Sequence, residues 1–119
     1  EAYDGSSLVI AYTHCIAQGI NIETAVEGCR DAVSSGHWTL LRYDPSRSEE
    51  GKNPLQLDSK EPGIGFEEYA LEQNRYRVLQ KADPEASDNL MRQAGQEART
   101  RFDLYEKMAD LPPSIIRVL

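Results

Sequence analysis

The residue with the clearest chemical potential is Cys15, which lies in residues 13–19, directly after the short apolar run of residues 7–12. A cysteine in such a loop can act as a nucleophile, as a metal ligand or as an unreactive thiol. The neighbouring His14 is a poor partner base, because adjacent side chains rarely converge on one point. An iron–sulfur or zinc site needs about four ligands, whereas the sequence has two cysteines and no Cys-x-x-Cys. Taken alone, Cys15 is expected to be a partly buried thiol.

The other candidates for metal, phosphate or cofactor binding favour structural roles. Cys29 falls on the apolar face of a predicted helix and is expected in the core, because a free thiol behaves as a small hydrophobic group. His14 and His37 show no His-Glu-x-x-His spacing, so each is expected to be a structural histidine. The Gly-Ile-Gly of residues 63–65 is not followed by Gly-x-x-Gly, which favours a flexible turn over a dinucleotide-binding loop.

The charged residues indicate neither a pair of catalytic carboxylates nor a nucleic-acid-binding surface. Two acidic pairs, at residues 49–50 and 67–68, fall in a polar loop and at a helix start, where solvated charge and the helix dipole account for them. The arginines are scattered among acids and form no basic stripe (Arg75, Arg77, Arg99 and Arg101). Residue chemistry alone therefore identifies no active site.

The first part of the chain, residues 1–44, predicts a strand–helix–strand unit. Residues 7–12 are β-rich and continuously apolar, which is typical of a strand buried on both faces of a parallel sheet; the alternative is the first turn of a buried helix. Residues 21–36 have helical periodicity and a glycine stop, and residues 37–43 predict a second strand. Residues 13–19 would then lie at the carboxyl edge of the sheet, where α/β proteins bind ligands.

The second part of the chain predicts a loop and helices. Residues 45–65 show no periodicity and predict a long loop, whose small apolar pair is Leu55 and Leu57. Residues 66–111 predict a two-helix tail, with one helix over 66–81 and a long helix from Asp83 to the prolines at 112–113.

Length and charge limit the function classes. A chain of 119 residues fits one domain, and its net charge of −7 argues against nucleic acid or an anionic membrane as a partner. No apolar run is long enough to cross a membrane, so we expect a cytoplasmic protein. A strand at residues 7–12 that is buried on both faces needs a sheet of more than two strands, with helices on each side. The fold class is therefore expected to be α/β, with residues 1–119 a single fragment from the C-terminal part of a larger parallel-sheet domain.

Four segments of the sequence resemble the C-terminal region of the pyruvate:ferredoxin (flavodoxin) oxidoreductases. They are residues 7–19 (SLVIAYTHCIAQG), 36–45 (GHWTLLRYDP), 51–62 (GKNPLQLDSKEP) and 74–79 (NRYRVL). Their order and spacing match as well, and the resemblance extends to about Ala109. The family's domain in this region is the thiamine diphosphate-binding domain, an α/β fold, which agrees with the expectation of a larger sheet.

The resemblance implies a specific activity for the full enzyme. Such enzymes decarboxylate pyruvate on thiamine diphosphate and Mg²⁺, form acetyl-CoA from CoA, and pass electrons through [4Fe–4S] clusters to ferredoxin or flavodoxin. By position, Cys15 would be the last ligand of the cluster nearest the thiamine. The other three cluster ligands and the Gly-Asp-Gly thiamine motif are absent here, so the chain alone is expected to bind no cofactor and to be inactive. Its partners would be the rest of the oxidoreductase chain and a second copy of the full enzyme.

Two other functions stay open at this level. The chain could be a free-standing, non-catalytic interaction module descended from this domain. It could also belong to an oxidoreductase for a different 2-oxoacid, because the substrate pocket would lie outside this region.

Overall fold

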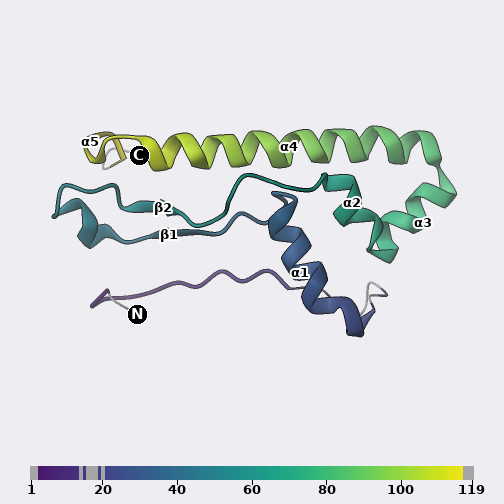
Figure 1. Cartoon of the computed structure of the whole chain (residues 1–119), viewed down its shortest axis with the longest axis horizontal. Coiled ribbons are helices and arrows are strands. Elements are labelled where there is room, and N and C mark those ends of the chain that lie inside the picture. Colours follow the sequence, from purple (N-terminus) through teal and green to yellow (C-terminus); the bar gives the residue numbers. More distant parts are fainter. Residues whose placement is uncertain (1–2, 14, 16–18, 20, 117–119) are drawn as a thin grey trace.

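The computed structural model describes residues 3–13, 15, 19 and 21–116. The molecule is elongated, with extents of 53 × 28 × 21 Å, and its long axis follows one helix (Figure 1). The elements in chain order are η2 (Ile22–Thr24), α1 (Ala25–Ser34), β1 (Leu41–Tyr43), η3 (Pro45–Ser48), β2 (Leu55–Leu57), α2 (Phe66–Leu71), α3 (Asn74–Ala82), α4 (Pro84–Asp110) and α5 (Pro113–Ile116). None of the helices in the described ranges is long and apolar enough to cross a membrane.

The predicted long helix is confirmed as α4. The Asp83 side chain accepts a hydrogen bond from the Ala86 backbone N–H at 3.0 Å, and Pro84 occupies the first turn, where its missing N–H costs nothing. The helix ends at Asp110, with only Leu111 between it and the prolines at 112 and 113, because a proline ring cannot continue an α-helix. The short α5 follows the first of these prolines, and residues 117–119 lie outside the described residues.

The predicted helix over residues 21–36 is confirmed as η2 and α1. The Asn21 side chain accepts from the Glu23 backbone N–H at 3.0 Å, and Gly36 has the positive φ of 72° that a helix stop requires. The single helix predicted over residues 66–81 is instead two helices. Gln73 has an extended backbone at φ −96° and ψ 131°, so α2 ends before it and α3 starts after it.

The strand predicted at residues 7–12 is not a strand in this structure. These residues have no ladder, and Leu8, Val9 and Ile10 are 85%, 80% and 72% exposed. The prediction of burial on both faces is therefore wrong for this chain. A strand needs a neighbour to satisfy its backbone, and both strands of the described ranges pair with each other instead.

The pairing of the second strand also differs from the prediction. β1 pairs antiparallel with β2, with Leu41 opposite Leu57 and Tyr43 opposite Leu55. The predicted parallel strand–helix–strand unit is thus not formed, and residues 45–65 are not a loop throughout. The alternation of Leu55 and Leu57 is the local signal of β2, but a three-residue strand becomes stable only through its partner.

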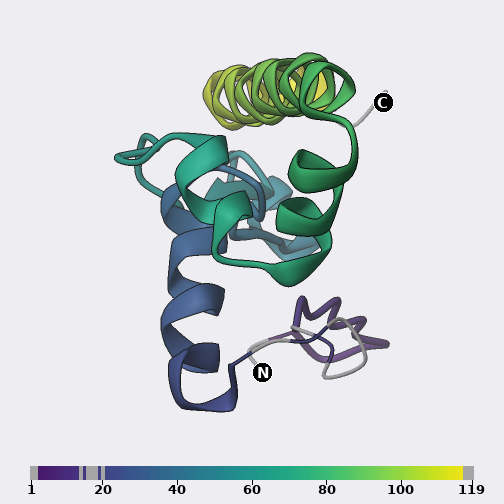
Figure 2. The same ribbon diagram turned by 90° about the vertical axis from the view of Figure 1, so that its right-hand side faces the viewer.

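The core lies where α1, α2 and α4 meet. Its buried members are Ala32, Phe66, Tyr69, Ala70, Met91 and Ala98. Figure 2 looks along α4 and shows the N-terminal segment on the far side of the molecule from that helix. The α2–α3 pair therefore lies between the long helix and the segment that leads to Cys15.

Candidate functional site

Cys15 is a free and exposed thiol, which corrects the expectation of a partly buried one. Its neighbour His14 lies outside the described residues, so the structure gives no geometry for that pair. Cys29 in α1 is only partly buried and is not a member of the buried core cluster, which corrects the expectation of a core position. The exposed thiol is the one of the two that a metal or a partner can reach.

The described residues cannot hold a metal ion by themselves. No group of three or more histidine, cysteine, aspartate or glutamate side chains among them is arranged to bind one. An iron–sulfur cluster needs about four ligands. Cys15 can therefore supply only one of them, and the other ligands would have to come from other residues.

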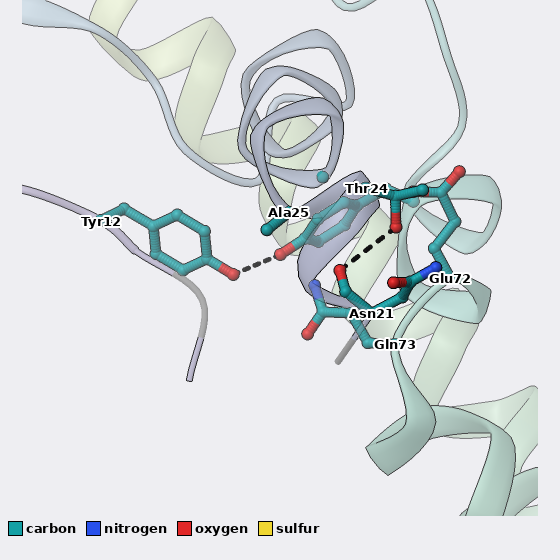
Figure 3. A pocket seen from close by; sticks show the side chains of 8 residues that line it. Tyr12, Asn21, Thr24, Ala25, Glu72 and Gln73 are labelled. Atoms are coloured by element: carbon teal, nitrogen blue, oxygen red, sulfur yellow. Dashed lines mark hydrogen bonds between the residues drawn. The ribbon is translucent and has the colours of Figure 1, made fainter. Parts of the chain in front are cut away.

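Tyr12 anchors the segment that precedes Cys15. Between residues 3 and 13 it is the only residue that is not exposed. Its ring stacks on Trp38, with ring centroids 5.4 Å apart and planes at 29°, and meets the ring of His37 edge-on at 5.5 Å. Its hydroxyl is hydrogen-bonded to the hydroxyl of Tyr69 on α2 (Figure 3). The contact joins residues 57 positions apart in the sequence.

The aromatic side chains around Tyr69 form one connected cluster. The His37 ring stacks on Tyr69 at 5.0 Å and lies 5.5 Å from Phe66, and Tyr76 meets Phe66 edge-on at 6.0 Å. Such pairs contribute about 0.5–1.5 kcal/mol each beyond their buried area. These ring contacts therefore stabilise the packing around Tyr69.

His37 is held neutral in this cluster. Burial is the main cause of its lowered pKa, and the positive charges of Arg101 and Arg75 lower it further. The Arg101 guanidinium also donates a hydrogen bond to the His37 backbone carbonyl at 2.7 Å. A neutral, stacked imidazole agrees with the prediction of a structural histidine.

A small cavity lies beside the two hydrogen-bonded tyrosines. Its wall includes Tyr12 and Tyr69, the start of α1, and Glu72 and Gln73 at the α2–α3 junction (Figure 3). Its volume of about 40 Å³ has room for one or two water molecules. Organic ligands occupy pockets of about 300–1,000 Å³, so this cavity cannot hold thiamine diphosphate or a nucleotide.

Gly19, four residues after Cys15, lies close to the start of α3. Gly19 has a positive φ of 70°, and a Cβ placed on it would lie 3.0 Å from Nδ2 of Asn74. A larger residue would therefore be strained by its backbone and crowded by its neighbour. Glycine here lets the chain pass against the start of α3.

The charged and glycine motifs take the structural roles predicted for them. Glu50 pairs with Lys52 at 2.7 Å on the surface, and residues 67–68 lie in the first turn of α2. Gly65 precedes α2 with an ordinary negative φ of −71°.

The residues that sequence reasoning missed lie in residues 51–62. The Asn53 amide donates to the backbone carbonyls of Met108, Ala109 and Leu111 at 2.9, 2.7 and 3.0 Å. Its own side-chain carbonyl accepts from the Leu55 backbone N–H at 2.8 Å. The signal available in the sequence was weak: a helix ended by proline leaves carbonyls unpaired, and an asparagine elsewhere can bind them. This segment therefore holds the end of α4.

No protein-family model matches this chain. The chain is, however, similar to named oxidoreductases over most of its length. It is 46% identical over 109 residues to a pyruvate-flavodoxin oxidoreductase of Trichormus variabilis and 41% identical over 110 residues to a pyruvate:ferredoxin oxidoreductase of Moorella thermoacetica. It is 40% identical over 114 residues to a mitochondrial pyruvate dehydrogenase [NADP(+)] of Euglena gracilis.

These matches cover 92% to 94% of this chain but only 6% to 9% of the relatives. The resemblance carried by residues 7–19 and the three later segments is thereby confirmed. The chain is a homologue of one small segment of the pyruvate-flavodoxin and pyruvate:ferredoxin oxidoreductases.

Proposed function

We propose that this chain is part of an enzyme that oxidatively decarboxylates pyruvate to acetyl-CoA and CO₂ and passes the electrons to ferredoxin or flavodoxin. The observation that carries the proposal is the 46% identity over 92% of the chain to a protein named for this activity. The Euglena relative is named for NADP(+), so this region is compatible with more than one final electron acceptor.

Exposed apolar side chains support a place inside a larger assembly. Leu8, Val9 and Ile10 are 72% to 85% exposed, and Ile22 and Val26 at the start of α1 are 73% and 75% exposed. Large apolar side chains that are exposed next to one another usually mark a surface that contacts another part of the protein or a partner. We infer that residues 7–12 become a strand of a parallel sheet in the full thiamine-binding domain.

Cys15 is proposed as one ligand of a [4Fe–4S] cluster in the full enzyme. It is exposed, and it follows directly on the segment proposed to enter the sheet. When bound, the cluster supplies one-electron transfer. This chain contributes the thiolate, and the remaining ligands come from outside the 119 residues.

The test is Cys15→Ser in the full-length oxidoreductase, followed by electron paramagnetic resonance of the reduced enzyme. We expect the signal of one cluster to disappear or change while thiamine diphosphate remains bound. Cys29→Ser is the matched control. It is expected to leave all cluster signals unchanged, because Cys29 is a partly buried residue within α1. An unchanged spectrum for Cys15→Ser would contradict the assignment.

The competing function is a free-standing interaction module, for which the same exposed apolar side chains would contact the partner. The size of the native protein separates the two functions. An immunoblot against residues 45–65 is expected to detect a chain many times larger than 13.4 kDa. A native band near 13.4 kDa would favour the interaction module.

A further inference from the structure

Tyr12 packs against the body of the molecule in the segment that leads to Cys15. Between residues 3 and 13, only Tyr12 is shielded from solvent. Cys15 lies three positions after Tyr12 along the chain, which is at most about 10–11 Å of extended backbone. The position of Tyr12 therefore limits where the Cys15 thiol can go.

The hydrogen-bond partner of Tyr12 is a buried core residue. Tyr69 is only 1% exposed and belongs to the core cluster with Phe66 and Ala70 on α2. Its hydroxyl binds the hydroxyl of Tyr12, and its ring is stacked by His37. Burial and the Tyr12 hydrogen bond both raise the pKa of the Tyr69 hydroxyl, so it stays protonated and able to donate.

A second contact lies on the other side of Cys15. Gly19, four residues later, passes close enough to Asn74 that a Cβ would lie 3.0 Å from the amide nitrogen. Asn74 begins α3 and Tyr69 lies on α2, and the two helices are joined through Glu72 and Gln73. Tyr12 and Gly19, which lie on either side of Cys15 in the sequence, are thus both close to one pair of consecutive helices.

We propose that Tyr12 and Tyr69 are positioning residues that hold the Cys15 thiol for ligation through their hydroxyl–hydroxyl bond. The inference rests on the proposed function of Cys15 as a cluster ligand. Some residues do not bind a metal themselves but orient one of its ligands. Removing such a residue changes the metal affinity by about tenfold to a hundredfold. The tyrosine pair would therefore affect the cluster without touching it.

The experiment uses Tyr69→Phe and Tyr12→Phe in the full-length, cluster-loaded oxidoreductase. Each variant removes one hydroxyl and keeps the ring, so the aromatic packing stays in place. The measurements are the paramagnetic resonance spectrum of the reduced enzyme and the rate at which an iron chelator removes the cluster. We expect a shifted or broadened signal and about tenfold faster iron loss. The double variant should be no worse than either single one, because both remove the same bond.

Tyr76→Phe is the matched control, since its ring packs on Phe66 in the same cluster but no bond joins its hydroxyl to Tyr12. It should behave like the parent enzyme. If Tyr69→Phe and Tyr12→Phe match the parent while Cys15→Ser loses the cluster, the positioning role is wrong and the ligand assignment stands. If Cys15→Ser keeps every cluster, the ligand assignment fails and the positioning role with it. Equal effects from Tyr76→Phe would reduce the role of the pair to general packing and overturn the inference.

Discussion

The hydrogen bonds between Asn53 and the end of α4 predict that replacing this one half-buried amide lowers the free energy of unfolding substantially. Its amide nitrogen donates to three backbone carbonyls at 2.7–3.0 Å, and its oxygen accepts from the Leu55 N–H at 2.8 Å. The two amide hydrogens make at least two of these bonds at full strength, and the oxygen makes one more. At about 0.5–1.5 kcal/mol net for each bond, Asn53→Ala should lower the free energy of unfolding by about 2–4 kcal/mol.

Asn53→Asp separates the hydrogen bonds from simple loss of side-chain volume. An aspartate keeps the acceptor for Leu55 but places a negative charge against three carbonyls at the negative end of the α4 dipole. It should therefore destabilise the chain at least as much as alanine at neutral pH, by about 0.3–1 kcal/mol more. Asn89→Ala is the control, because Asn89 lies on exposed α4 surface with one contact to Arg92, and the expected change is within about 0.5 kcal/mol.

Equilibrium unfolding in urea measures these differences, with Trp38 fluorescence for the core and far-ultraviolet circular dichroism for the helices. The two signals should report the same midpoint if the chain unfolds in one step. A change below about 0.5 kcal/mol for Asn53→Ala, or an aspartate variant more stable than the alanine variant, would refute the reasoning.

Two further predictions follow from backbone strain and from the buried imidazole. Gly36→Ala should lower stability by about 1–2 kcal/mol or more, because the position has φ 72° and the new Cβ would lie 2.9 Å from Cγ of Pro62. Gly28→Ala, in α1 with no atom within 4 Å of the new Cβ, should instead raise it by about 0.5–1 kcal/mol, and thermal melts that move the same way for both would contradict the argument. The lowered pKa of His37 means that the unfolded state binds more protons, so its contribution to stability is present above pH 6.5 and is lost as the pH falls through the folded-state value. His37→Phe keeps a ring beside Tyr69 and should flatten the urea-midpoint profile between pH 7.5 and about pH 5; an unchanged slope would assign the acid sensitivity to other groups.

The sequence correctly predicted the parts of the fold that depend on interactions between residues close together in the chain. The start of α4 at Asp83 and Pro84 and the end of α1 at Gly36 follow from hydrogen bonds and backbone angles within a few residues. The packing role of His37 was also predicted correctly, because the sequence lacks the spacing of a metal site. These features do not require knowledge of what packs against them.

The sequence alone could not show the features that depend on distant residues. β2 exists because β1 lies beside it, and the bonds from Asn53 reach carbonyls 55 to 58 residues away. The Tyr12–Tyr69 bond spans 57 residues. No periodicity in a short segment encodes such a contact, since either partner is an ordinary polar or aromatic residue until the fold brings them together.

The candidate site divides in the same way. The sequence by itself determined that Cys15 follows a continuously apolar segment and that its surroundings resemble one enzyme family. Only the tertiary structure decided that the thiol is exposed, that Leu8 to Ile10 lie in solvent, and that Tyr12 and Gly19 contact the α2–α3 pair on either side of it. The physical reason is that residue type fixes what a side chain can do, whereas exposure and position depend on which other segments are close enough to cover or hold it.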